Sequence, residues 1–90
     1  MQKGAFFSLV YYAERLGEGP VEAQVNEDSR GLFYTLAVDD GHGPIYLETQ
    51  RGKIREFRSL DTLYKLLRDN YVYTFTTNLG PAHGPIESNR

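Results

Sequence analysis

Turn-forming residues divide this chain into short segments, and this division limits its fold more than any other feature. Clusters rich in Gly, Pro, Asn and Asp lie at residues 17–20, 26–31, 39–44 and 51–52. Because helices and strands seldom continue through such clusters, each intervening segment can form only a short element. The 90 residues also fit a single domain, whose core must be modest in size.

Three of the segments show the composition and alternation of strands. Val21 to Val25 alternates apolar and polar side chains, which predicts a half-buried strand. Leu32 to Val38 is apolar on both faces, so we expect it near the centre of a sheet. Tyr71 to Thr77 alternates again and predicts the final strand.

A hairpin is predicted in the middle of the chain. Ile45 to Gln50 and Lys53 to Arg58 read as two strands, with Arg51 and Gly52 between them. A tight turn needs a residue with positive φ, and glycine takes that conformation without steric cost.

The segment 59–69 is predicted to be a helix. Ser59 is a suitable N-cap, and Asp61 lies in the first turn, where negative charge is favoured. The apolar residues follow at the spacing of one buried stripe: Leu60, Leu63, Tyr64 and Leu67. Asn70 suits a left-handed C-terminal cap.

The segment from Ala5 to Leu16 permits two interpretations. Its Phe, Val and Tyr residues favour a strand. The positions of one helical face are nevertheless all apolar: Phe6, Leu9, Val10, Ala13 and Leu16. Gly17 can then cap the C-terminus, so we favour a helix.

These elements predict an α+β fold: an antiparallel sheet of four or five strands, packed by the helix at 59–69 and by an N-terminal helix. We expect one domain over residues 1–77 and a flexible C-terminal tail over 78–90, where Gly, Pro, Ser and Asn are frequent. The order of the strands does not follow from the sequence.

Composition argues against several classes of chemistry. The chain has no Cys, which excludes thiolate catalysis, zinc fingers and iron–sulfur clusters and favours a cytoplasmic protein. Both histidines, His42 and His83, lie in Gly/Pro loops, and a metal site needs three or four ligands. We find no nucleophile elbow and no phosphate-binding loop. We therefore expect no catalytic residues, no metal, no cofactor and no enzymatic activity.

Charge is unevenly distributed along the chain. Residues 1–50 carry a net charge of −5, whereas residues 51–68 carry +4 within an overall charge of −2. Basic residues beside aromatic rings on a sheet can bind phosphates and stack on bases. Charge that protects a sheet edge from aggregation is the more common reason for such a pattern. The candidate binding surface comprises Arg51, Lys53, Arg55, Arg58, Lys65, Arg68, Tyr46, Tyr71 and Tyr73.

Part of the chain resembles a group of bacterial proteins. The Arg51-Gly52 turn is followed by an Arg-x-Phe strand at 55–57 and a Ser-Leu-Asp helix start at 59–61. Over residues 45–76 this pattern is similar to small uncharacterised proteins of proteobacterial plasmids, phages and integrative elements. The resemblance implies a cytoplasmic setting and a mobile genetic element, and it implies no active-site residues.

The leading hypothesis is a non-enzymatic binding protein that modulates a host or mobile-element macromolecule by protein–protein contact. Its seven Tyr residues are well suited to contacts, because their rings offer large area at low entropic cost. The alternative is a nucleic-acid-binding regulator that uses the basic segment 51–68, although the net negative charge argues against non-specific binding. We expect no membrane association, and a homodimer is compatible with the exposed sheet edges.

Overall fold

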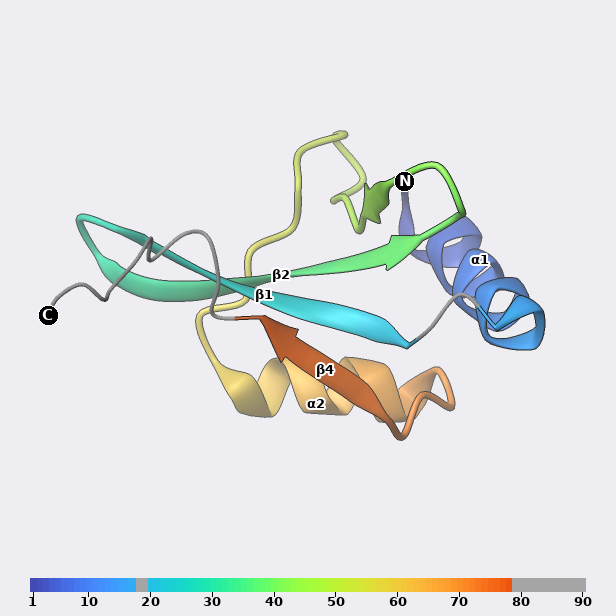
Figure 1. The fold of residues 1–90 in the computed structure, drawn as a ribbon. Helices are drawn as coiled ribbons and strands as arrows, with labels where there is room; N and C mark the ends of the chain where they lie inside the picture. The colour runs from blue at the N-terminus through green and yellow to red at the C-terminus, as the bar shows by residue number, and fades with distance from the viewer. Residues whose placement is uncertain (18–19, 79–90) are drawn as a thin grey trace, which may run out of the picture.

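The computed structural model describes residues 1–17 and 20–78. These residues form two helices and a four-stranded sheet. The elements are α1 (Lys3–Leu16), β1 (Val21–Asp28), β2 (Gly31–Asp39), β3 (Pro44–Tyr46), α2 (Leu60–Asp69) and β4 (Phe75–Asn78) (Figure 1). The α+β prediction is therefore confirmed. Most of the predicted tail, residues 79–90, lies outside the described residues.

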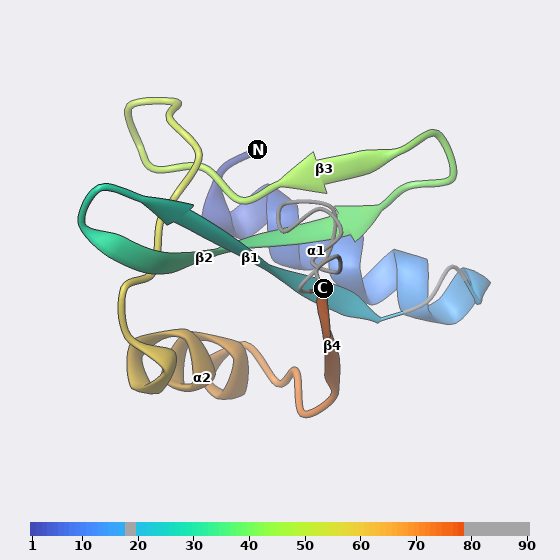
Figure 2. The same ribbon diagram turned by 60° about the vertical axis from the view of Figure 1, so that its left-hand side comes forward.

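The sheet has the order β3-β2-β1-β4 and is mostly antiparallel. β1 and β2 form an antiparallel hairpin in which Ala23 lies opposite Leu36. β3 adds to the outer edge of β2, also antiparallel. β4 joins the other edge and runs parallel to β1, with Val21 opposite Phe75. Figure 2 shows β3 and β4 on opposite sides of the central hairpin.

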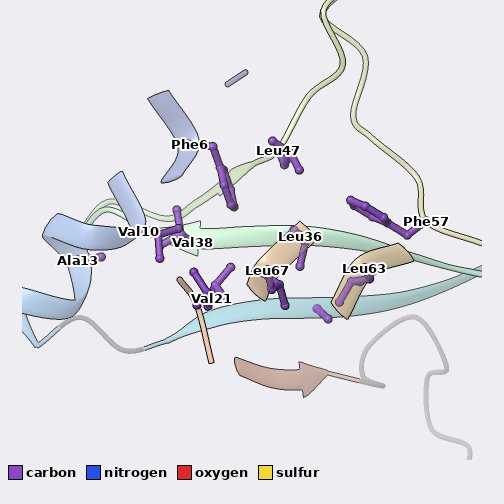
Figure 3. Close-up of a cluster of buried hydrophobic side chains, with 12 residues drawn as sticks. Phe6, Val10, Ala13, Val21, Leu36, Val38, Leu47, Phe57, Leu63 and Leu67 are labelled. Atoms are coloured by element: carbon purple, nitrogen blue, oxygen red, sulfur yellow. The ribbon is translucent and has the colours of Figure 1, made fainter. Parts of the chain in front are cut away.

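Both helices contribute to one core. On β1 and β2 the side chains of Val21, Ala23, Leu36 and Val38 are buried on the same face, as the strand alternation requires. Phe6 and Val10 of α1 and Leu63 and Leu67 of α2 complete this cluster, together with Leu47 and Phe57 (Figure 3). The opposite face carries polar side chains, among them Glu22, Gln24 and Asn26.

The helical interpretation of the N-terminal segment is correct. Phe6, Val10 and Ala13 are buried along α1, and Gly17 ends the helix with a φ of 78°. Leu16 belongs to the predicted apolar face but is exposed, because it lies in the last turn beyond the edge of the core. Burial against the sheet thus outweighs the strand preference of the Phe and Tyr residues.

The predicted hairpin at 45–58 is only partly correct. β3 ends at Tyr46, and two isolated bridges continue the pairing: Glu48 with Ile54, and Tyr34 of β2 with Phe57. Residues 49–53 form the turn, in which Gly52 has a φ of 86°. The segment leaves the edge of β2 after Leu47 and returns to it at Phe57, so a regular two-stranded ladder does not form.

The end of α2 differs from the prediction at Asn70. Asn70 has a φ of −110°, and Tyr71 instead takes the left-handed conformation with a φ of 64°. The amide of Tyr71 donates to the carbonyl of Arg68, and the amide of Val72 donates to that of Leu67. These are the two hydrogen bonds of a Schellman motif, in which Tyr71 takes the position usually held by glycine.

The predicted strand at 71–77 begins later than expected. β4 starts at Phe75, because residues 71–74 form the connection between the helix and the sheet. Val72 is buried while Tyr71 and Tyr73 are 81% and 71% exposed. The alternation that predicted a strand here therefore arises from one buried side chain, Val72, between two exposed tyrosine rings.

Candidate functional site

The nine predicted binding residues do not form one surface. The fold distributes them over the turn at 49–53, the tip of the β1–β2 hairpin, the polar face of the sheet, and the outer side of the helices. The residues in question are Arg51, Lys53, Arg55, Arg58, Tyr46, Lys65, Arg68, Tyr71 and Tyr73.

Arg58 is held by the β1–β2 hairpin. Its Nη2 lies 2.6 Å from Asp28 Oδ2, its Nη1 lies 3.0 Å from Asp28 Oδ1, and the guanidinium carbon lies 4.7 Å from the centre of the Phe33 ring. Glu56 lies 3.4 Å away on its own segment. These contacts occupy the planar fork, so Arg58 joins two parts of the fold rather than presenting a free cation.

This ion pair changes the pKa of both partners. The hydrogen bond from the Arg58 side chain, helped by the backbone amide of Arg30, lowers the pKa of Asp28 to about 2. The same hydrogen bond raises the pKa of Arg58. The basic segment therefore meets the acidic half of the chain at this point.

Arg51 and Lys53 lie on the turn at 49–53 and are exposed. The Thr49 hydroxyl accepts hydrogen bonds from both of their backbone amides, each at 3.3 Å, which fixes the turn. Arg55 is less free, since its guanidinium lies 4.7 Å from the centre of the Phe57 ring. Among the basic residues of the segment 51–58, Arg51 and Lys53 are thus the two that are exposed.

Tyr46 lies apart from these cations, on the polar face of the sheet. Its hydroxyl donates to Gln24 Oε1 at 2.9 Å, and Gln24 Nε2 donates to Glu22 Oε1 at the same distance. The ring of Tyr46 is half-buried in this network. Its contacts are structural, and it is not positioned to stack beside the basic residues.

The turn containing His42 has no metal-binding cluster. His42 is exposed, and its Nδ1 lies 3.8 Å from Asp40 Oδ1. Asp39 accepts hydrogen bonds from the amides of Gly41 and Gly43, so its carboxylate shapes the turn. No group of three or more metal-ligating side chains occurs among residues 1–17 and 20–78, and His83 lies outside them.

Exposed tyrosines are the most distinctive surface feature of the described chain. The structure describes all seven tyrosines, and five of them are exposed large side chains. They are Tyr11, Tyr12, Tyr64, Tyr71 and Tyr73. Buried aromatic area comes mainly from Phe6 and Phe57 instead. Because exposed aromatic rings are enriched at contact surfaces, these tyrosines define the candidate site.

Three of these tyrosines line a groove of about 700 Å³ between α1 and the turn at 70–72. We call this the tyrosine groove; its rings are those of Tyr11, Tyr12 and Tyr71, and Phe7 and Val72 add apolar surface. Tyr11 and Tyr12 meet edge to face, with ring centres 5.8 Å apart. The lining of this groove is mostly apolar, as is usual for binding pockets.

The rim of the tyrosine groove is held in place by local contacts. Arg15 lies 5.3 Å from the centre of the Tyr11 ring and donates a hydrogen bond of 3.2 Å to its hydroxyl. The Schellman motif fixes the backbone of Tyr71 on the opposite wall. Preorganised rings lose little conformational entropy when they bind a partner.

Sequence reasoning included Tyr71 in the binding surface but missed Tyr11 and Tyr12. A signal for these two was present: they fall outside the apolar stripe of Phe6, Val10 and Ala13, which predicts that their rings face away from the core. The sequence places Tyr71 among the binding residues, but Tyr11 and Tyr12, which face it across the groove, belong to α1, far away in sequence.

The remaining predicted residues belong to α2 and the connection that follows it. Lys65, Arg68 and Tyr73 line a second depression of about 470 Å³, which they share with Asp61, Tyr64 and Asp69. Lys65 lies 3.9 Å from Asp69, one helical turn away. This surface therefore carries both signs of charge.

No family model, curated protein or solved structure matches this chain. Neither helix in the described part of the chain is long and apolar enough to cross a membrane.

Proposed function

We propose that this chain is a non-enzymatic binding protein that modulates a host or mobile-element macromolecule by protein–protein contact at the tyrosine groove. The observation that carries this proposal is the grouping of Tyr11, Tyr12 and Tyr71 around one apolar depression. A groove of this kind suits a protein segment that places apolar side chains against the rings and accepts hydrogen bonds from tyrosine hydroxyls. The proposed setting is the bacterial cytoplasm.

The backbone at Tyr71 supports this proposal. A side chain other than glycine disfavours the left-handed conformation, and Tyr71 has a φ of 64° while 81% exposed. Because the ring is so exposed, its packing contributes little energy that could compensate for the backbone strain. Strained residues with exposed side chains occur often at functional sites, where the side chain itself is required.

Affinity capture from a bacterial lysate, followed by mass spectrometry, tests the proposal when wild type and two variants are compared. Tyr71→Gly removes the ring while relieving the backbone strain, so a loss of the captured protein is not explained by unfolding. Tyr12→Ser removes a ring from the opposite wall. We expect both variants to lose the same partner.

Leu32→Ser is the matched control, because Leu32 is 51% exposed on the β1–β2 hairpin, away from the groove. It should capture the partner as wild type does. Equal capture by wild type, Tyr71→Gly and Tyr12→Ser would overturn the assignment to the tyrosine groove.

A nucleic-acid-binding regulator is the second candidate, and the exposed cations of the turn at 49–53 favour it. Arg51 and Lys53 project from a turn whose backbone is fixed by Thr49. Electrophoretic shift titration with single- and double-stranded DNA and RNA at low salt tests this role. Binding that disappears on reversing the charge of Arg51 and Lys53, and that weakens with salt, would support it. The absence of a shift at micromolar protein would reject it.

A further inference from the structure

β4 is the last strand of the described sheet on the side opposite β3. A strand pairs with one neighbour through alternate residues, so the other residues direct their amides and carbonyls outward. No residue from Phe75 to Thr77 is charged or proline, and Thr76 and Thr77 are exposed. The residue types that commonly prevent a sheet edge from pairing with another strand are therefore missing from this part of β4.

The surface beside this edge contains exposed aromatic rings. Tyr64, Arg68, Tyr73 and Phe75 line a groove of about 370 Å³ between α2 and β4. The rings of Tyr64 and Phe75 are in contact, with centres 5.7 Å apart. The outer side of α2 and the start of β4 are thus joined by this ring contact.

The charges on the outer side of α2 follow a definite order. Asp61, Tyr64, Lys65 and Arg68 lie at i, i+3, i+4 and i+7, which is one stripe of a helix. We call these four residues the α2 stripe. It is acidic at its N-terminal end and basic at its C-terminal end, about two turns apart. Asp69 lies 3.9 Å from Lys65 and offsets part of the positive charge near its centre.

This order is self-complementary when two copies of α2 run antiparallel. Asp61 of one copy then lies opposite Arg68 of the second, and the same pair recurs across the two-fold axis. The axis passes between Tyr64, whose ring is 43% exposed, and Lys65, so each Lys65 lies opposite the Tyr64 ring of the second copy. A cation can pack on the face of a tyrosine ring, and the two Asp61–Arg68 pairs then lie around this centre.

We propose that two copies of this chain form a two-fold symmetric dimer in which β4 pairs antiparallel with β4 of the second copy and the α2 stripes pack against each other. An antiparallel pair of identical strands satisfies two-fold symmetry and joins the two sheets into one. The four-residue strand is too short to hold two chains together alone, so the α2 stripe supplies the remaining contact and fixes the register.

The dimer surface and the tyrosine groove use different tyrosine rings, although the buried Val72 lines both depressions. The dimer surface uses Tyr64 and Tyr73, whereas the groove uses Tyr11, Tyr12 and Tyr71. The two proposals can therefore fail independently. Tyr71→Gly should dimerise as wild type does, and variants of Asp61 should still capture a groove partner.

Sedimentation equilibrium of the full chain tests the association directly. Between about 1 μM and about 500 μM protein, we expect the mass to rise from that of one chain to twice that value. High salt should weaken the dimer, because part of its stability comes from charge. A single-chain mass over the whole range would overturn the proposal.

A charge exchange tests the predicted contact. Asp61→Arg places two cations opposite each other and should weaken the dimer by about tenfold. Adding Arg68→Asp in the same chain exchanges the charges and should restore the affinity to within about threefold. Arg51→Glu, a charge reversal on the exposed turn at 49–53 beside the β3 edge of the sheet, is the control and should leave the dimer unchanged. Failure of the double variant to recover, with its helix content intact by circular dichroism, would reject the antiparallel α2 contact.

The lack of cysteine provides a second, independent measurement. Thr76→Cys and Thr77→Cys, introduced separately, place one thiol on β4, and residues facing each other across an antiparallel pair are close enough for a disulfide. At least one variant should cross-link rapidly into a dimer under mild oxidation. Ser29→Cys, on the exposed β1–β2 turn, is the control. Cross-linking no faster than the control at either β4 position would overturn the pairing of β4, even if the charge variants fail to fold.

Discussion

Both terminal nitrogens of the Arg58 guanidinium donate hydrogen bonds to the carboxylate of Asp28, which lies thirty residues earlier in the sequence. The contact joins the segment before α2 to the tip of the β1–β2 hairpin. It also places the guanidinium over the ring of Phe33, 4.7 Å from its centre. A cation that sequence analysis assigned to a binding surface thus has a structural role.

This pair should make stability depend on acid pH. The pKa of Asp28 falls from 3.8 to about 2 on folding, so the folded state favours the ionised form. The stabilisation is complete above about pH 5 and is lost as pH falls from about 4 to about 2. Asp28→Asn should lower the melting temperature near neutral pH. Melting curves of both proteins from pH 7 to pH 2 should converge at the acid end, and a constant difference at every pH would contradict this account.

Replacing Tyr71 with glycine should stabilise the fold relative to a matched substitution. Tyr71 has a positive φ, whereas Tyr73 does not, and both rings are largely exposed. Each change to glycine raises the entropy of the unfolded chain by a similar amount, so the comparison isolates the strain. Tyr71→Gly should be more stable than Tyr73→Gly by about 1 kcal/mol. Urea unfolding at about 1 μM protein, where a single-chain mass is expected, measures the difference, and equal stability would show that Tyr71 is not strained.

Ser59 should contribute to the stability of α2 through its cap. Its hydroxyl accepts a hydrogen bond of 3.4 Å from the amide of Thr62. Ser59→Ala removes the acceptor and should cost about 1 kcal/mol of unfolding free energy. Ser59→Asp keeps an acceptor and places negative charge at the helix N-terminus, so it should unfold at or above the wild-type urea concentration. If alanine and aspartate behave alike, the cap has no energetic role.

Two leucines of α2 should differ sharply when shortened. Leu63 is fully buried in the core, whereas Leu60 is 38% exposed. Leu63→Ala removes buried apolar surface and leaves a cavity, which should cost about 3 kcal/mol. Leu60→Ala should cost less than about 1 kcal/mol. The urea midpoints of the two variants test this ranking, and a larger loss for Leu60→Ala would show that α2 is rotated relative to the core.

The helices and the first two strands could be predicted because their signals are local. The N-cap at Ser59, the stripe ending at Leu67 and the alternation of Val21 to Val25 each concern neighbouring residues. The parallel pairing of Val21 with Phe75 could not be predicted, since it depends on where the chain returns after α2. The left-handed conformation of Tyr71 could not be predicted, because Asn70 has the higher preference for left-handed backbone. The packing of Val72 onto the core decides the position instead.

The candidate site was harder to predict than the fold. Composition identified tyrosine as the residue type of interest, and the structure places Tyr71 in the tyrosine groove. The spacing of charges, by contrast, suggested one basic surface from Arg51 to Arg68. The fold separates those residues because the chain leaves β2 at Leu47 and returns at Phe57, and because Arg58 finds Asp28 on another strand. Pairing between charges on segments far apart in sequence cannot be predicted from the charges within one segment.

The parallel alignment of β1 and β4 has a consequence for the order of folding. During synthesis, β1 and β2 can pair soon after they emerge, whereas β1 has no partner on its other side until Phe75 has been made. Contacts between residues so distant in sequence form slowly, because a long loop must close first. Docking of α2 onto the hairpin brings the ends of that loop together, so attachment of β4 is expected to be the last step. Until then the nascent chain exposes the edge of β1 that later pairs with β4. An unpaired strand edge favours aggregation, so the chain is most vulnerable to aggregation at this stage.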